Sequence, residues 1–320
     1  MVSSFQEEKL SDNTIVVTSR EAGQKLLQLL ERRLLLPQSL LHRWIRTGQI
    51  RCNSARCKPF ERIGEGTVIR LPPAAKKMAQ QAAFSKKDVS LPLPPTRGEH
   101  NGLVAYSKPA GLPTHAGTDQ KDCLAVRLHK AHEGESFLPT PCHRLDKDTS
   151  GLILVAESYA ALRSANQMIV QGEMQKEYLC WVHGKWPHKE AFVLKHFLAK
   201  QRSNGFEKMT VVEKNQGKLA LSFVYPVVCG QEKSLLLVRI HTGRKHQIRV
   251  QMAYTGHPIL GDHKYGMQDS CHSLLLHAAR IILPDGYVFE DLPPWPSPYA
   301  VTELPLPSHH HALIEGEHRV

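Results

Sequence analysis

The sequence predicts an α+β protein with two folded parts, and three observations lead to this prediction. The chain of 320 residues is long enough for two domains, and 41% of its residues are hydrophobic, which is enough for packed cores. Residues 20–72 combine apolar residues at helical spacing with short segments typical of strands. From Gly102 to about Pro298, apolar segments alternate with turn residues, which indicates a second, larger folded region.

The first folded part begins with two predicted helices. Apolar residues at 26–34 recur every three or four residues, and Pro37 interrupts this pattern. A second apolar stripe covers 40–45, and a glycine then supplies a stop signal. Two segments typical of strands follow, at 50–53 and 67–71, with glycines at turn positions between them.

Composition divides the chain further. Residues 73–98 are rich in Ala, Lys, Pro and Ser, which is typical of a partly extended linker. The tail carries three adjacent histidines, His309 to His311, which could bind metal weakly, although a disordered polar tail is the preferred interpretation. The expected organisation is a flexible N-terminus at 1–19, a small domain at 20–72, the linker at 73–98, a large domain at 99–304 and a disordered tail at 305–320.

Several features bear on where the protein works. No apolar run approaches the roughly 20 residues that a membrane helix needs. The first thirty residues carry four acidic side chains and no long apolar stretch, so no signal peptide is expected. The seven cysteines are an odd number without a Cys-x-x-Cys pair, which argues against a disulfide framework and a zinc ribbon. We therefore expect a cytoplasmic protein without a membrane partner.

Positive charge is concentrated in the small domain. The whole chain carries 41 Lys and Arg against 30 Asp and Glu, a formal charge of +11. Residues 20–72 hold eleven Lys and Arg against four Glu, so these 53 residues supply +7. A solvated helix face could explain such a run, but its concentration on two helices and a small hairpin favours a face that binds phosphates. Arg43, Arg46 and Arg51 are the candidate contacts on this face.

The densest polar cluster runs from His143 to Gly151, and an apolar segment at 152–156 follows it. A polar turn that leads into a buried strand is a good position for a catalytic group, because the strand is rigid and the turn opens onto a cleft. Three interpretations compete for Asp146 and Asp148. They could form a metal-binding loop, a solvated turn, or a pair of carboxylates like that of a glycosidase. Their spacing alone leaves the choice open.

A second polar cluster covers residues 241–252. It is predicted to contain a helix with Thr242 as its cap, and Gly256 and Pro258 give stop signals.

The charged side chains of this second cluster suggest an anion. Arg249 and His246 are three residues apart and would share one helical face. Arg244 and Lys245 near a helix N-terminus oppose the helix dipole, so we expect both to face an anion. His241 and His246 could suggest a metal site, but the sequence offers no evident third ligand, and we expect no metal.

The small domain resembles an S4-type RNA-binding domain. The resemblance rests on Gln24 to Leu27, on the run from Ser39 to Asn53, and on the closing Gly64 to Ile69.

The large domain resembles the RluA-type family of pseudouridine synthases. The family signature His-Arg-Leu-Asp-x-x-Thr-Ser-Gly matches His143 to Gly151. Gln251 stands where the family commonly has histidine. Further matches are Asn101–Leu112, Lys176–Tyr178, Thr242–Val250, Gly256–Asp262 and Leu276–Ala278.

The resemblance implies a fold and a reaction. The fold is α+β, with a mixed, largely antiparallel sheet and a central RNA cleft in the catalytic domain, preceded by the small α+β S4-like domain. The reaction breaks the N1–C1′ bond of a uridine in RNA, rotates the uracil and joins C5 to C1′. It implies no cofactor, and the sequence contains neither of the glycine-rich nucleotide-binding motifs. The expected partner is RNA, most naturally large-subunit ribosomal RNA with transfer RNA still open, and the expected state is a monomer.

The resemblance also assigns roles to residues. Asp146 would attack C1′, attack C6 of the uracil, or stabilise charge on a glycal-like route, and the sequence leaves these three open. Arg249 would pair with Asp146, and Tyr178 would pack on the base and act in proton transfer. Arg144 would fill the gap left by the flipped nucleotide. The residues expected to contact RNA are Arg144, Arg244, His246, Gln247, Arg43, Arg46 and Arg51.

Less specific interpretations remain. Tyr178 could be an ordinary aromatic residue of a strand, and Arg249 could belong to a structural ion pair. The chain could also be an RNA-binding protein without catalytic activity, such as a chaperone or assembly factor, although its complete set of Asp146, Tyr178 and Arg249 disfavours this. A metal-dependent hydrolase is the third alternative.

Overall fold

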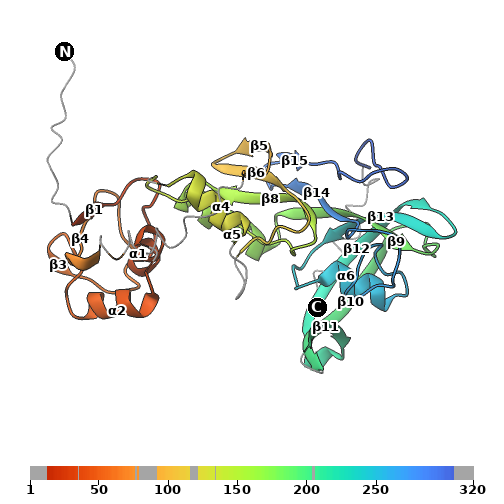
Figure 1. Ribbon diagram of the computed structural model, residues 1–320, viewed down its shortest axis with the longest axis horizontal. Coiled ribbons are helices and arrows are strands. Elements are labelled where there is room, and N and C mark those ends of the chain that lie inside the picture. Colours follow the sequence, from red (N-terminus) through yellow and green to blue (C-terminus); the bar gives the residue numbers. More distant parts are fainter. Residues whose placement is uncertain are drawn as a thin grey trace, which may run out of the picture. The chain divides into compact units, whose positions relative to one another are not determined.

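The structure, a computed structural model, describes the chain in two compact units (Figure 1). The residues described are 13–34, 36–75, 78, 92–115, 122–133, 135–203 and 206–305. The first unit comprises Met1–Leu93, Val126–Thr140 and Ala156–Ser164. The second comprises Pro94–Ala125, Pro141–Val155 and Ala165–Val320.

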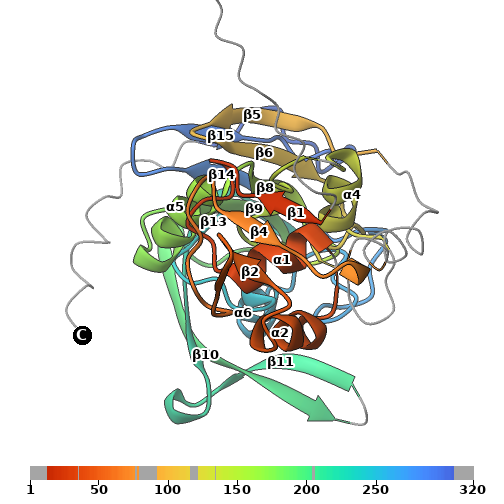
Figure 2. The same ribbon diagram turned by 90° about the vertical axis from the view of Figure 1, so that its left-hand side faces the viewer.

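In the described residues of the first unit, helices α1 and α2 pack beside a small sheet (Figure 2). The segments Val126–Thr140 and Ala156–Ser164 add most of α4 (Leu124–Ala131) and the beginning of α5 (Tyr159–Gln171) to the same unit. Its strands are ordered β1-β4-β2-β3. The leucines that predicted the first helix are buried in a common core with Trp44 and Ile45 of the second. The elements are β1 (Thr14–Val16), α1 (Leu26–Leu34), α2 (Gln38–Arg46), β2 (Arg51–Cys52), β3 (Ala55–Arg56) and β4 (Val68–Arg70).

Three of the expected boundaries are corrected or left open by the structure. The flexible N-terminus at 1–19 is wrong from residue 14 onward, because β1 pairs antiparallel with β4. The linker at 73–98 is wrong at both ends, because Ala75 lies in the core of the first unit and β5 begins at Thr96. Short strands of this kind become visible only when their partners are known. The tail beyond residue 305, with its histidines, lies outside the described residues.

In the described residues of the second unit, eleven strands form one sheet. Their order is β11-β10-β12-β13-β9-β14-β8-β6-β5, with β15 paired to β14 and β7 paired to β8. The β14–β8 pair is parallel and the other pairs with a known register are antiparallel, which confirms the expected mixed, largely antiparallel sheet. The strands are β5 (Thr96–His100), β6 (Leu103–Lys108), β7 (Thr140–Pro141), β8 (Ser150–Ala156), β9 (Gln175–His183), β10 (Phe192–Ser203), β11 (Phe206–Val212), β12 (Lys218–Cys229), β13 (Lys233–Ile240), β14 (Leu276–Ile282) and β15 (Val288–Glu290).

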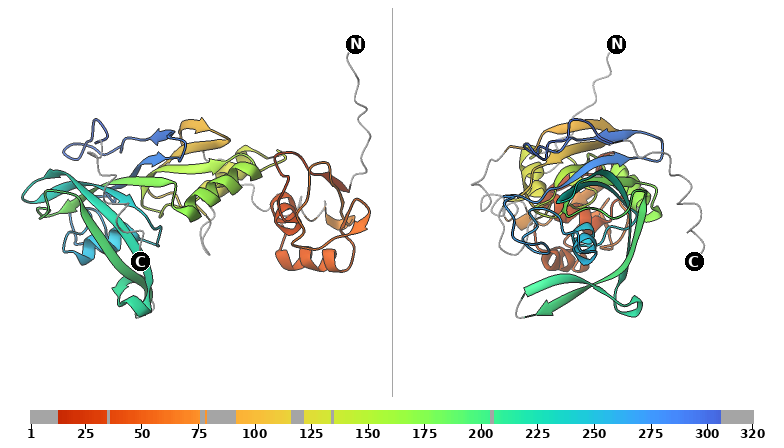
Figure 3. Two further views of the ribbon diagram at one scale, coloured as in Figure 1. Left: turned by 180° about the vertical axis from the view of Figure 1, so that it is seen from behind. Right: turned by 90° about the vertical axis from the view of Figure 1, so that its right-hand side faces the viewer.

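The structure also describes helices α4 (Leu124–Ala131), α5 (Tyr159–Gln171) and α6 (Gln247–Tyr254) and the short 3-10 turn η1 (Lys214–Gln216). The β10–β11 hairpin extends away from the rest of its sheet, as both views in Figure 3 show. None of the helices that the structure describes is long and apolar enough to cross a bilayer. All seven cysteines are described, and none forms a disulfide.

The parallel contact between β8 and β14 brings the polar turn next to the middle of the sheet. All seven residues of β8 are buried, as its apolar run predicted. Gly151 of β8 lies opposite Ala278 of β14, and Ala278 lies opposite Tyr178 of β9. The two backbones approach so closely that a Cβ atom on Gly151 would lie 2.3 Å from the carbonyl oxygen of Ala278. Since Gly151 also has a φ of +104°, only glycine fits this crossing without strain.

We expect Gly151→Ala to destabilise the second unit by about 2 to 4 kcal/mol, because the new methyl group would force apart two central strands. Urea unfolding of the full chain would measure this loss. Gly243→Ala is the matched control in the same unit, because a Cβ there meets nothing within 4 Å. Its stability should stay within about 0.5 kcal/mol of the parent. Equal stability of the two variants would contradict the proposed close crossing.

Candidate active site

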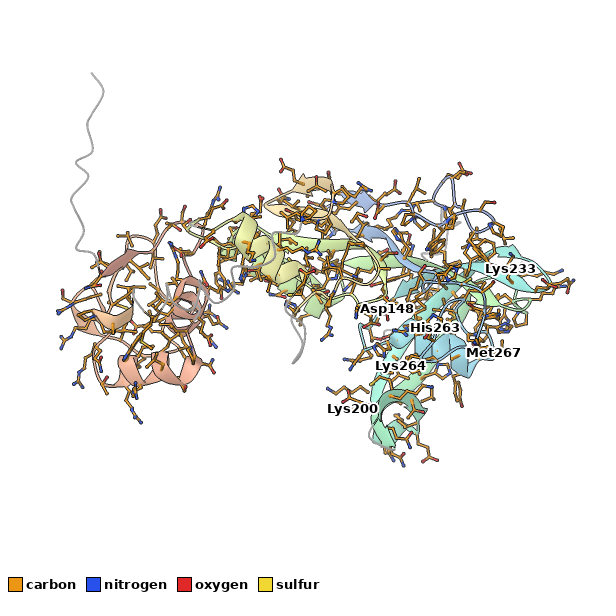
Figure 4. The ribbon with its side chains drawn as sticks, viewed as in Figure 1. Asp148, Lys200, Lys233, His263, Lys264 and Met267 are labelled. Atoms are coloured by element: carbon orange, nitrogen blue, oxygen red, sulfur yellow. The ribbon has the colours of Figure 1, made fainter. Side chains whose placement is uncertain are left out.

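Two adjoining cavities in the second unit meet at the polar turn. One has a volume of about 700 Å³ and is bordered by the turn at 142–146, by Tyr178 and by the segment 240–249. The other, of about 850 Å³, is bordered by Lys147, Asp148, Lys208 and the loop around Lys264. Figure 4 shows Asp148, His263 and Lys264 close together at this second cavity. The side chains common to both cavities are Asp146, His246 and Arg249.

The polar turn is held in place by the segment that follows β6. The hydroxyl of Thr114 donates to the carbonyl of Leu145 at 3.0 Å and accepts from the amide of Leu145 at 3.1 Å. The amide of Gly111 donates to the carbonyl of Lys147 at 2.9 Å. The backbone on both sides of Asp146 is therefore fixed by hydrogen bonds, and those of Thr114 to Leu145 are buried.

Lys108 also holds the backbone next to Asp146 in place. No role was assigned to it from the sequence. Its side chain is fully buried, and its ammonium donates to the carbonyls of Leu112 at 2.8 Å, Pro109 at 3.0 Å and Lys147 at 3.1 Å. Burial lowers the pKa of Lys108 to about 7, while the carboxylates of Asp148 and Asp146 act in the opposite direction. Three carbonyl acceptors require three N–H donors, so the geometry favours the charged ammonium. A lysine at the end of an otherwise apolar strand was the signal in the sequence.

Asp146 occupies a largely enclosed position in the first cavity. Its side chain is 18% exposed, whereas Asp148 is exposed and borders only the second cavity. Burial raises the pKa of Asp146, and the charges of Arg249 and Arg144 oppose that rise. The two carboxylates therefore lie in different surroundings, and Asp146 alone faces the cavity bordered by Tyr178.

Tyr178 lies on β9 with only 7% of its surface exposed, and it borders the same cavity as Asp146. Burial raises the pKa of its phenol, and the nearby charge of Asp146 adds to this effect. The hydroxyl therefore stays protonated and can donate a hydrogen bond or a proton.

Arg249 does not pair with Asp146 as the sequence had suggested. Its guanidinium holds Asp262 with two hydrogen bonds, Nε to Oδ2 at 2.8 Å and Nη2 to Oδ1 at 2.7 Å. Both side chains are buried, at 5% and 1% exposure. The amides of Lys264 and Tyr265 also donate to Asp262 at 3.0 Å, so this carboxylate is fully engaged. The charge of Arg249 still acts on Asp146 through space.

His246 links Asp146 to the loop after Asp262. It precedes α6 in the left-handed conformation, with a φ of 54°. Its Nδ1 lies 2.6 Å from the hydroxyl of Tyr265, and its Nε2 lies 3.8 Å from Oδ1 of Asp146. Burial lowers the pKa of His246 to about 3, with further lowering from the charges of Arg249, Lys264 and Lys245. The imidazole is therefore neutral and carries a single proton.

The hydrogen bonds around Tyr265 indicate where that proton sits. The amide of Met209 donates to the Tyr265 hydroxyl at 3.1 Å, and we assign the hydroxyl proton to the 2.6 Å contact with Nδ1 of His246. An imidazole that accepts at Nδ1 carries its proton on Nε2. The Nε2–H group then faces the carboxylate of Asp146, which is the favourable orientation for a negative charge.

Gln247 and Thr242 have structural tasks that differ from the expected ones. Thr242 does not cap α6, which begins at Gln247. Its hydroxyl accepts from the amide of Leu221 and donates to the side chain of Gln247 at 2.8 Å. The Gln247 amide nitrogen donates to the carbonyl of Leu221 and the hydroxyl of Ser222. Its side-chain hydrogen bonds are therefore made within the protein. Only contacts between distant segments could have revealed this.

The remaining predicted RNA contacts are divided between the units. Arg144 is exposed at the first cavity, and Arg244 borders it with its Nε bonded to the carbonyl of Leu219. Arg43 and Arg46 are exposed on α2, and Arg51 is exposed on β2, all in the first unit. Among the residues that the structure describes, no group of three or more His, Cys, Asp or Glu is arranged to hold a metal ion.

Comparison with known proteins adds an independent observation. The sequence profile of the family described as RNA pseudouridylate synthase matches residues 102–254. The chain is also similar to curated proteins named ribosomal large subunit pseudouridine synthase C. It is 31% identical to the protein of Yersinia pestis over 278 residues, which cover 83% of this chain and 86% of that protein. It is 30% identical to the protein of Escherichia coli (strain K12) over 302 residues, which cover 87% and 90%.

Two solved structures resemble the chain in fold. The structure named Human RNA Pseudouridylate Synthase Domain Containing 1 has a TM-score of 0.52 at 24% identity and covers 63% of this chain and 83% of that chain. The structure named Human RNA Pseudouridylate Synthase Domain Containing 4 has a TM-score of 0.51 at 23% identity and covers 61% and 87%. This similarity supports the α+β fold with its large, mostly antiparallel sheet.

We expect Tyr265→Phe to remove the proton preference of His246, because Nδ1 would lose its donor. Nitrogen NMR of protein with isotope-labelled histidine would report this as a convergence of the Nδ1 and Nε2 shifts of His246. A sample of His246→Asn identifies the signal. Tyr254→Phe is the control, because the Tyr254 ring is 64% exposed and its ring contact is with His196. Unchanged His246 shifts in Tyr265→Phe would refute the assigned proton position.

Proposed function

Because this chain belongs to the RNA pseudouridylate synthase family, as the motif from His143 to Gly151 had suggested, we propose that it converts specific uridines of large-subunit ribosomal RNA to pseudouridine. The relatives named ribosomal large subunit pseudouridine synthase C support this choice of substrate, since the aligned region covers most of both chains. The reaction is an isomerisation. The N1–C1′ bond breaks, the uracil turns, C5 joins C1′, and the C5 proton is exchanged for one at N1.

The observation that carries the proposal is the enclosed carboxylate of Asp146 where the two cavities meet. Arg249 is committed to Asp262, and His246 approaches Asp146 no closer than 3.8 Å in the described structure. The carboxylate therefore keeps its lone pairs for the substrate while nearby positive charge keeps it ionised. We assign Asp146 as the catalytic carboxylate, acting by attack at C1′, by attack at C6 or by stabilising charge on a glycal route.

Two further side chains of the cleft complete the catalytic proposal. Tyr178 packs against the uracil, and its protonated hydroxyl is suited to proton transfer during the exchange at C5. Arg144 is exposed at the cavity mouth, where its guanidinium can take the place of the nucleotide that has been flipped out of its helix. Arg249 acts on Asp146 through its charge and positions the loop of Asp262.

We propose that the first unit is an S4-like RNA-binding domain. Its two helices and small sheet, and the +7 charge of residues 20–72, support this role. Arg43, Arg46 and Arg51 are exposed and would contact phosphates. The second unit, with its segments Pro94–Ala125, Pro141–Val155 and Ala165–Val320, would hold the chemistry.

The reaction as written needs no oxidant, reductant or group from outside, so the residues of this chain suffice for its chemistry. The expectations of no cofactor, a monomeric state and a cytoplasmic location stay predictions.

We expect Asp146→Asn to lower the rate of pseudouridine formation by on the order of a thousandfold or more, since no carboxylate would remain at the glycosidic bond. The fold should be at least as stable as the parent, because the substitution removes a charge from a desolvated site. Asp148→Asn is the matched control, and its rate should stay close to that of the parent. A single-turnover assay on ribosomal RNA measures both. An inactive parent protein that still binds RNA would favour the non-catalytic alternative instead.

The rate should also depend on pH through Asp146. Because the pKa of Asp146 is raised by burial, the carboxylate is protonated at a higher pH than the ordinary value of about 3.9. The single-turnover rate should therefore be full above this raised pKa and fall as the pH drops through it. Arg144→Gln removes one of the charges that lower this pKa, so its acid limb should move to higher pH. An identical acid limb in both proteins would contradict the assigned electrostatics.

Replacing Arg43, Arg46 and Arg51 by glutamine should weaken RNA binding without a comparable loss of saturating rate. Each lost phosphate contact should lower the salt-dependence slope by about 0.7 to 0.9, so three contacts lower it by about 2 to 3. Binding titrations at several salt concentrations beside a single-turnover assay give both quantities. An unchanged slope with a collapsed rate would show that these arginines shape the active site instead.

A further inference from the structure

The first unit exposes a phenylalanine within its basic surface. Phe60 is 64% exposed, more than any other aromatic residue described in this unit. Exposure of so large an apolar ring to water is unfavourable, and the two side chains known to contact it, Lys25 and His42, are both polar.

The backbone that carries Phe60 is held firmly. The residues on either side offer their carbonyls to the first amides of α1, with Leu26 donating to Glu61 and Leu27 donating to Pro59, each at 2.9 Å. These helix amides would otherwise lack partners. The turn is closed by the amide of Lys58, which donates to the Glu61 carboxylate at 3.0 Å. The ring is therefore presented by a fixed backbone rather than by a loose loop.

The surroundings of the ring are suited to a polyanion that carries flat groups. The ammonium of Lys25 lies over one face of the ring, 5.5 Å from the centroid, so a base would stack on the other face. The imidazole of His42 meets the ring edge to face at a centroid distance of 5.8 Å. His42 belongs to α2, which also exposes Arg43 and Arg46. The Glu61 carboxylate is the acidic group nearest in the chain, and it is occupied by the turn.

We propose that Phe60 is the stacking platform of a single-stranded RNA site on the first unit, with an unpaired base on the ring and Lys25 beside the adjoining phosphate. Aromatic side chains among cations bind unpaired bases because every base offers a flat face, whereas bases in a duplex are already stacked on one another. The inference rests on the proposed RNA binding of this unit, and it adds that the unit recognises unpaired nucleotides.

The test separates stacking from charge. The probes are a labelled oligoadenylate of roughly 12 nucleotides, a length that such sites cover, and a guanosine–cytidine duplex of similar length. Neither contains uridine, so the reaction cannot interfere. The full-length proteins are the parent, Phe60→Leu, Phe60→Trp, and the pair Arg43→Gln with Arg46→Gln. Val16→Ala is the control for loss of another exposed apolar side chain of the same unit, and thermal unfolding of each variant checks the fold.

Phe60→Leu should weaken oligoadenylate binding about 5- to 150-fold at every salt concentration, with an unchanged salt slope, because stacking releases no counterions. Phe60→Trp should bind at least as well as the parent, and duplex binding should be unaffected in both. The fluorescence of a 2-aminopurine base in the probe should change on binding to the parent, because the base leaves the adenine stack, and should change less on binding to Phe60→Leu.

Other outcomes overturn the proposal. One such outcome is that Phe60→Leu binds oligoadenylate as tightly as the parent, while the double variant Arg43→Gln with Arg46→Gln lowers the salt slope. The unit would then bind RNA without this platform. An equal loss on duplex RNA would place Phe60 in general rather than single-strand binding. If neither set of variants changes binding, both the platform and the proposed RNA role of the unit fail. A loss in Phe60→Leu with no effect of the arginine pair would keep the platform and remove only the phosphate contacts.

Discussion

The two hydrogen bonds between Arg249 and Asp262 set the chemistry of the cleft. An arginine beside an enclosed aspartate would normally pair with it, and a carboxylate in such a pair has little freedom to react. Here the guanidinium is held by a second carboxylate, which is itself held by two backbone amides. The positive charge of Arg249 therefore lies near Asp146, while its hydrogen bonds go to Asp262. The charge of Arg249 thereby offsets part of the rise in the pKa of Asp146 that burial causes.

The same loop positions His246. Asp262 accepts from the amide of Tyr265, and the hydroxyl of Tyr265 contacts Nδ1 of His246. The imidazole then turns its other nitrogen toward Asp146. A single polar assembly therefore connects the guanidinium of Arg249, the imidazole of His246 and the carboxylate of Asp146. Since its members are shielded from water, the loss of one would leave another without a partner, and its effect would extend beyond one hydrogen bond.

The sheet supplies the rigidity on which these distances depend. β8, β14 and β9 are aligned at Gly151, Ala278 and Tyr178, so the turn of Asp146 is anchored next to the phenol. Glu177, the residue before Tyr178 on β9, is buried and forms ion pairs with Arg239 of β13 and Arg280 of β14. These pairs link β9 to its two neighbouring strands. On α6, the fully buried Gln251 donates to carbonyls of β10 and β12 and accepts from Ser222. These bonds hold α6 against the two strands.

The sequence by itself determined the elements whose signal is local. The leucine spacing predicted α1, the apolar run predicted β8, and the motif around Asp146 predicted the family. The tertiary structure alone decided the partner of Arg249, the use of Gln247 within the protein, the buried role of Lys108 and the pairing of β1 with β4. The reason is physical. The apolar spacing of a helix or the apolar run of a buried strand is a pattern among residues that are close in the sequence. An ion pair or a short strand depends on which distant segments the folded backbone brings together.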